Sequence, residues 1–305
     1  MTRPRSHRIR TLTALGLTAA LALAVTACGS SDDSSSSGKD NGKGGVTLRL
    51  GYFPNLTHGT AIVGVERGIY AKALGTNTLK TSTFKDGTEA VEALNADAVD
   101  ATYIGTGPAI NLFQKSNGQA IRIVSGATSG GAAFVVAKDI DSAKDLKGKT
   151  VSSPKLGNTQ DVSLRAWLKS QGLETTTSGG GDVKILPQEN AQTLDAFKAG
   201  DIAGAWLPEP WATRLVLEGD GKVLVDERDL FDDGQFATTN LVVAKTFLDA
   251  HPDVVKQLLQ GQVEANDWIN ANSDAAKGIV NKALKDLTGK DLPAATIDAA
   301  WKNLS

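Results

Sequence analysis

From Val46 onward, the sequence alternates between short segments typical of β-strands and amphipathic segments typical of α-helices. Strands are expected at 46–53, 79–84, 99–104, 120–125, 132–137, 149–153, 182–186, 202–207, 222–225 and 237–244. Helices are expected at 58–74, 88–95, 159–171, 190–199 and 210–218, from Pro108, and throughout the residues after 244. This alternation predicts an α/β fold in which helices cover both faces of mostly parallel sheets.

An internal similarity divides the chain into two lobes. The segment 89–109, EAVEALNADAVDATYIGTGPA, aligns without a gap with 192–212, QTLDAFKAGDIAGAWLPEPWA. The predicted first lobe comprises residues 46–136 plus 236–305, and the second comprises residues 137–235. Two lobes joined by two crossing segments enclose a ligand cleft and can close by a hinge. The alternative is that any two strand–helix units share such a pattern.

The first 45 residues have the features of an export signal and a tether. Four arginines precede the apolar run 12–25, and Val25-Thr26-Ala27-Cys28 matches a bacterial lipobox. We predict a lipoprotein signal peptide at 1–27, a lipidated Cys28 that anchors the chain outside the cell membrane, and a flexible tether at 28–45. The alternative is an ordinary signal peptide in which Cys28 is incidental.

Composition and missing motifs exclude most other chemistry. The net charge of -2 gives no nucleic-acid footprint, and a single cysteine excludes intrachain disulfides and thiolate zinc clusters. Three widely separated histidines exclude the usual imidazole metal sites. The sequence has no G-x-S-x-G elbow, no Walker loop and no G-x-G-x-x-G. We therefore expect neither a cofactor nor enzyme activity. We also expect the chain to be a monomer.

The candidate site is a set of loops at the carboxyl ends of the predicted strands, where ligands bind in α/β sheets. These loops are 54–58, 105–108, 157–161 and 208–211, together with the small polar run 125–131. Backbone N–H groups at helix starts favour an anion, and the hydroxyls of Thr57, Thr106 and Thr159 add donors. The alternative role of these threonines is helix capping.

Several other residues in these loops have two interpretations. His58 is a pocket donor or a surface residue at a helix start. Trp211 is a pocket wall, whereas Trp206 is expected in the core. Glu209 and Asp161 either bind an ammonium group of the ligand or only lie at a helix start, where the positive end of the helix dipole stabilises a carboxylate.

Six motifs occur in fixed order along the chain: GYFPNLTHGTAIVGVERGIY, DATYIGTGPA, VSGATSGGAAFVV, LKGKTVSSPKLGNTQDVSLRAWL, AWLPEPWATRLVLEGDGKVLVDE and FATTNLVVAKTFLDAHPDVV. By these motifs the chain resembles the nitrate/sulfonate/taurine family of solute-binding lipoproteins that serve bacterial ABC importers, with the aliphatic-sulfonate branch closest. The resemblance implies a type II periplasmic-binding-protein fold with two lobes, a ligand cleft and two hinge crossovers. It also implies an ABC permease and a cytoplasmic ATPase as partners.

By the same resemblance, the ligand-binding residues are Asn55, Thr57, His58, Thr106, Gly107, Thr128, Thr159, Gln160, Glu209 and Trp211. Family members usually continue beyond the position of Ser305, so a truncated chain is expected. The predicted function is capture of a small anionic organosulfur solute, an aliphatic sulfonate or taurine, by hinge closure. The alternatives are nitrate, bicarbonate or a thiamine-precursor pyrimidine in the same cleft, or an exported hydrolase on the same scaffold.

Overall fold

The computed structural model describes residues 45–305. The predicted signal peptide, the lipidation site Cys28 and the tether up to residue 44 lie outside the described residues. Within the described residues, no helix is both long and apolar enough to cross a bilayer.

The first sheet contains strands from both ends of the described chain. Its order is β2 (Thr78–Thr83), β1 (Thr47–Tyr52), β3 (Ala101–Gly105), β10 (Ala237–Ala244) and β4 (Ile121–Ser129). β1 pairs in parallel with β2 and β3, whereas β10 runs antiparallel between β3 and β4. The alternating apolar residues of these strands, such as Leu48 and Leu50, are fully buried in one large core.

The second sheet repeats this order with different strands. It runs β7 (Lys184–Pro187), β6 (Thr150–Ser153), β8 (Gly204–Pro208), β5 (Ala132–Val136) and β9 (Lys222–Asp226). Here β5 is the antiparallel strand, between β8 and β9. Both sheets are therefore mostly parallel, as predicted, with one antiparallel strand in the fourth position of each.

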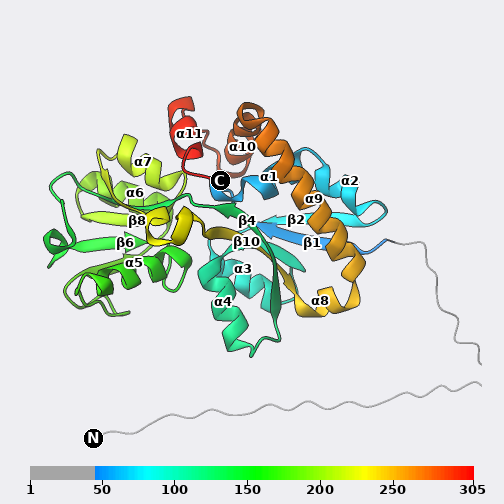
Figure 1. The fold of residues 1–305 in the computed structure, drawn as a ribbon, viewed down its shortest axis with the longest axis horizontal. Coiled ribbons are helices and arrows are strands. Elements are labelled where there is room, and N and C mark those ends of the chain that lie inside the picture. The colour runs from blue at the N-terminus through cyan, green and yellow to red at the C-terminus, as the bar shows by residue number, and fades with distance from the viewer. Residues whose placement is uncertain (1–44) are drawn as a thin grey trace, which may run out of the picture. The chain divides into compact units, whose positions relative to one another are not determined.

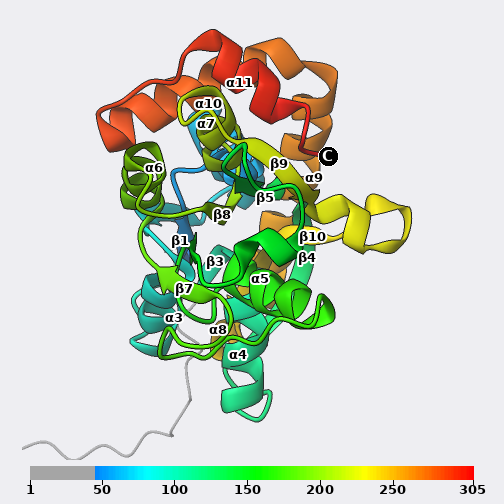
Figure 2. The same ribbon diagram turned by 90° about the vertical axis from the view of Figure 1, so that its left-hand side faces the viewer.

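Helices cover both faces of each sheet (Figure 1). On the first lobe, α1 (Gly59–Glu66) and α2 (Ile69–Leu74) pack with α9 (Pro252–Ala271) and α10 (Ser273–Thr288), and α3 (Gly87–Asn95) and α4 (Thr106–Lys115) lie on the other side. On the second lobe, α5 (Thr159–Ser170) lies opposite α6 (Asn190–Ala199) and α7 (Trp211–Leu217). α8 (Lys245–Ala250) leads into α9, and α11 (Ala294–Trp301) packs against both α10 and α7. Figure 2 shows α10 and α11 running across the top of the molecule.

The two antiparallel strands are the crossovers between the lobes. β5 follows β4 after only two glycines, Gly130 and Gly131, but pairs with β8 and β9, so residues 132–136 belong to the second sheet. The predicted division placed these residues with the first lobe. β10 returns the chain from the second lobe to the first sheet. This exchange confirms the predicted fold of two α/β lobes with two crossovers.

Two local expectations are corrected. The helix predicted at 58–74 is interrupted at Gly68, whose φ of 68° is left-handed, so the segment forms two helices, α1 and α2. A 3-10 turn at Leu56–His58 precedes α1. The helix predicted from Pro108 begins two residues earlier, at Thr106. Pro108 is tolerated in this first turn because its missing N–H has no partner within the helix.

Candidate functional site

The loop after β1 brings three predicted site residues into a buried position. Asn55, Thr57 and His58 are all buried, in and just before the 3-10 turn that precedes α1. The Nδ2 atom of Asn55 donates to Oγ1 of Thr57 over 3.2 Å, while its Oδ1 atom has no hydrogen-bond partner. Turning the amide over would exchange the two atoms, so either orientation leaves one buried polar atom of Asn55 free.

His58 is a neutral donor in this site. Its ring stacks on Phe53 with centroids 4.4 Å apart, and its Nδ1 atom accepts the backbone N–H of Phe53 over 3.2 Å. Because Nδ1 is an acceptor, the proton is on Nε2. Burial lowers the pKa of His58 to about 3, since desolvation penalises the imidazolium. His58 therefore offers one N–H group and no positive charge.

Glu209 joins the second lobe to this group. Its backbone N–H donates to the carbonyl of Gly131 over 2.8 Å, and a Cβ atom placed on Gly131 would lie 3.2 Å from Cγ2 of Thr57. The buried carboxylate accepts from the backbone N and the Oγ1 of Thr213 and from Nδ2 of Asn303, which lies just after α11. Burial raises the pKa of Glu209, and these hydrogen bonds oppose the rise. The carboxylate thus caps the start of α7 and holds Asn303.

The starts of α4 and α5 touch each other. The backbone N–H of Gly107 donates to Oγ1 of Thr159 over 3.1 Å, so these two predicted site residues are hydrogen-bond partners. The hydroxyl of Thr106 donates to the carbonyl of Ala237 over 2.5 Å and accepts from Asn240 over 2.8 Å. In this arrangement, the Thr106 hydroxyl holds β10 in place.

Asp161 has a local structural role. Its carboxylate accepts from Ser153 Oγ, Gly157 N and Arg165 Nε at 2.8–2.9 Å, which stabilises the turn before α5. Trp206 is fully buried against Phe134, as expected of a core residue.

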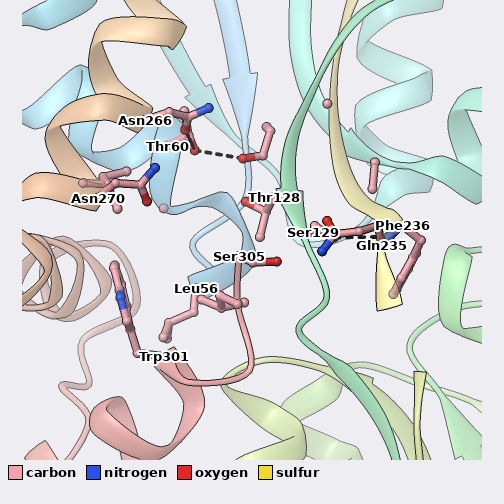
Figure 3. Close-up of a pocket in the computed structure, with 16 residues that line it drawn as sticks. Leu56, Thr60, Thr128, Ser129, Gln235, Phe236, Asn266, Asn270, Trp301 and Ser305 are labelled. Carbon is pink, nitrogen blue, oxygen red and sulfur yellow. Dashed lines mark hydrogen bonds between the residues drawn. The ribbon is translucent and has the colours of Figure 1, made fainter. Parts of the chain in front are cut away.

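The remaining predicted residues lie at different places around this region. Gln160 is buried as the second residue of α5, and Trp211 packs its ring on the guanidinium of Arg214 at 4.6 Å. Thr128, near the end of β4, instead lines a cavity of about 520 Å³ beside α1 and α9 (Figure 3). The structure therefore places the β3 loop against the β6 loop, places the β8 loop against Gly131 beside Thr57 of the β1 loop, and leaves Thr128 at a separate cavity.

Sequence reasoning missed most residues of that cavity. No charged side chain among residues 45–305 lines it; the lining consists of Leu56, Gly59, Thr60, Gly126, Ala127, Thr128, Ser129, Gln235, Phe236, Ala237, Asn266, Ile269, Asn270, Trp301, Leu304 and Ser305. The spacing of Asn266 and Asn270, four residues apart in α9, was the available signal, because residues i and i+4 share a helix face. Trp301 and Ser305 reach the cavity only through the tertiary fold, as Figure 3 shows.

Comparison with known proteins identifies the family. A model of the NMT1-like family matches residues 42–284. The chain belongs to the NMT1-like family. One relative, the taurine-binding periplasmic protein of Escherichia coli, is 31% identical over 209 residues, which cover 67% of this chain. The match spans 61% of the length of that relative.

Solved structures with the same fold include other binding proteins. The alkanesulfonate-binding protein SsuA from Xanthomonas axonopodis superposes with a TM-score of 0.69 at 19% identity, covering 85% of this chain and 86% of that one. The nitrate-binding protein NrtA from Synechocystis superposes with a TM-score of 0.67 at 19% identity, covering 79% and 66%. Because both identities are low, at 19%, the likeness shows that the chain shares the periplasmic-binding-protein fold with these structures.

Among the described residues, no group of three or more His, Cys, Asp or Glu is placed to hold a metal ion.

Proposed function

We propose that this member of the NMT1-like family is an extracytoplasmic solute-binding protein that captures a small anionic organosulfur compound between its lobes. The solute would be an aliphatic sulfonate or taurine, delivered to the permease of an ABC importer that a cytoplasmic ATPase drives. The chain would act as a monomer, anchored outside the membrane through a lipidated Cys28. The 31% identity to a taurine-binding protein supports this choice of ligand class.

One observation carries the proposal. The free amide atom of Asn55 and the Nε2–H of His58 lie in the first lobe, and the carbonyl of Gly131, beside Thr57, accepts the backbone N–H of Glu209 from the second lobe. Neutral polar groups from both lobes thus meet at the crossover. The Nε2–H of His58 is a neutral donor in a buried position. Such a donor suits a singly charged oxyanion, because it hydrogen-bonds an oxygen without a second charge that must be desolvated.

Titration calorimetry of the purified protein with ethanesulfonate, taurine, nitrate, bicarbonate and an aminopyrimidine tests the ligand class. We expect the sulfonates to bind, and Asn55→Leu to weaken their binding at least tenfold, since it removes both amide atoms from the site. Asn95→Ala, an exposed residue at the end of α3, is the matched control. Binding of nitrate, bicarbonate or the pyrimidine alone would replace the organosulfur proposal with that ligand.

The same samples distinguish binding from catalysis. We expect an ethanesulfonate ester to remain intact after prolonged incubation with the protein, as measured by mass spectrometry. Conversion of the ester in proportion to protein concentration would favour the hydrolase alternative and contradict the transport role.

A further inference from the structure

The second lobe inserts two residues into the starts of two helices of the first lobe. Oδ1 of Asn158 accepts the backbone N–H of Gly87, the first residue of α3, over 3.1 Å. Oγ1 of Thr159 accepts the backbone N–H of Gly107, the second residue of α4, over 3.1 Å. Both acceptors stand at the start of α5, so three helix starts converge on this contact.

The side chain of Asn158 makes an unusual contact for a residue at the start of a helix. It is the N-cap residue of α5, where an asparagine side chain normally accepts an N–H group of its own helix. The Asn158 side chain makes no such bond and instead accepts the backbone N–H of Gly87 at the start of α3 in the other lobe. An oxygen at a helix start is stabilised by the free N–H groups and the helix dipole there, which is the same interaction that an anionic ligand would make.

Three glycines make this close approach possible. A Cβ atom on Gly107 would lie 2.8 Å from the backbone N of Thr159, and Cβ atoms on Gly87 and Gly105 would overlap the side-chain oxygens of Asn158 and Thr159. Contacts below 3.0 Å to backbone atoms cannot be relieved by turning a side chain. Any side chain at Gly107 would therefore force the two lobes apart.

We propose that Asn158 and Thr159 form a latch that closes the lobes without solute by occupying the N–H groups of Gly87 and Gly107. These N–H groups are then used between the lobes, and solute is held by the group around Asn55, Thr57 and His58. Two contacts at the rim support the latch: Lys155 lies 3.7 Å from Asp86, and Asn111 donates to the Gly157 carbonyl over 3.4 Å. The inference rests on the hinge closure of the proposed function.

Spin-label distances between the lobes test the latch directly. Labels would replace the exposed Lys115 on α4 and Lys169 on α5 in the full chain carrying Cys28→Ser, which removes the sole cysteine. Without solute, we expect the wild-type background to show mainly the short, closed distance and Gly107→Ala to show mainly a longer one. Gly278→Ala is the matched control, because a Cβ atom there meets nothing within 4 Å.

A second pair of variants tests the hydrogen bond rather than the shape. Thr159→Val keeps the volume but removes the acceptor of the Gly107 N–H, so the closed-to-open ratio should fall about tenfold. Thr159→Ser should restore most of that ratio. An unchanged distance in Gly107→Ala, or a wild-type protein that is mainly open without solute, would overturn the latch.

The latch and the solute proposal can fail separately. Closure without solute in the wild type, together with opening in Gly107→Ala, supports the latch even when no sulfonate binds, and only the ligand assignment would then fall. Sulfonate binding to a wild type that closes only when solute is added would overturn the latch and leave the solute proposal standing.

Discussion

The Nδ2 atom of Asn303 donates a hydrogen bond of 2.7 Å to Oε1 of Glu209. This bond ties the residues that follow α11 to the start of α7 in the second lobe. It is reinforced at residues 129–131, where Ser305 and Ser129 exchange two backbone hydrogen bonds of 2.6 and 3.0 Å. The segment after α11 therefore contacts a crossover and the second lobe together.

We expect Asn303→Ala to lower the free energy of unfolding by about 1–3 kcal/mol, because it leaves a buried carboxylate one donor short. Urea denaturation at pH 7 measures the loss. Asn95→Ala, at an exposed position, should change the stability by less than about 0.5 kcal/mol. Equal stability of Asn303→Ala and the wild type would mean that water replaces the Asn303 amide without cost.

His58 should make the protein less stable in mild acid. Its pKa is about 3 in the folded protein and about 6.5 when unfolded, so between these values only the unfolded state binds the proton. Stability therefore falls as the pH falls through this window. From pH 7.5 to pH 5, wild type should lose about 2 kcal/mol more than His58→Gln, measured by urea denaturation at both pH values. Parallel losses in the two proteins would contradict a buried, neutral His58.

Glu227 should have the opposite effect at higher pH. It accepts from Ser163 and from Nε1 of Trp206, and burial raises its pKa to about 7. Between its unfolded value of about 4.3 and 7, the folded state holds a proton that the unfolded state has released, so stability falls as the pH rises. Wild type should lose about 3 kcal/mol relative to Glu227→Gln between pH 4.5 and pH 8, again measured by urea denaturation. A constant difference between the two proteins would show that Glu227 is ionised throughout.

Phe134 tests the assignment of β5 to the second lobe. Its ring stacks on Trp206 with centroids 5.6 Å apart and contacts Trp167 edge-on. Phe134→Ala should cost about 3–5 kcal/mol through the cavity it leaves. Hydrogen exchange should then accelerate first in β8 and β9, the partners of β5. Acceleration confined to β3 and β4 would contradict this pairing.

Most of the secondary structure was predictable because it depends on local patterns. The alternation at 46–53 gave β1 and the short segment 237–244 gave β10 nearly to the residue, and α6 was predicted at the bounds it has. The break at Gly68 was not predicted, because apolar residues continue on both sides of it. Only the left-handed φ of Gly68 ends α1 there.

The candidate site was predicted less completely. Periodicity and loop position singled out Asn55, Thr57, His58, Thr159 and Glu209 as candidate site residues, and the structure buries all five. They could not show that Gly107 and Thr159 bind each other or that Glu209 binds Asn303, because these partners are 52 and 94 residues apart. Whether a residue favours a helix start depends on the local sequence. Which group binds the free N–H groups of that helix start depends on how the other lobe packs against it.

The sequence by itself determined that the chain has two α/β lobes and that polar, glycine-rich loops lie at the ends of their strands. These features are predictable because the hydrophobic periodicity of a strand or helix depends only on residues close together in the sequence. The tertiary structure alone decided that β5 pairs within the second sheet and that Asn158 and Thr159 occupy helix starts of the first lobe. These outcomes depend on hydrogen bonds between distant segments, whose partners are selected only when the two sheets have formed and the lobes meet.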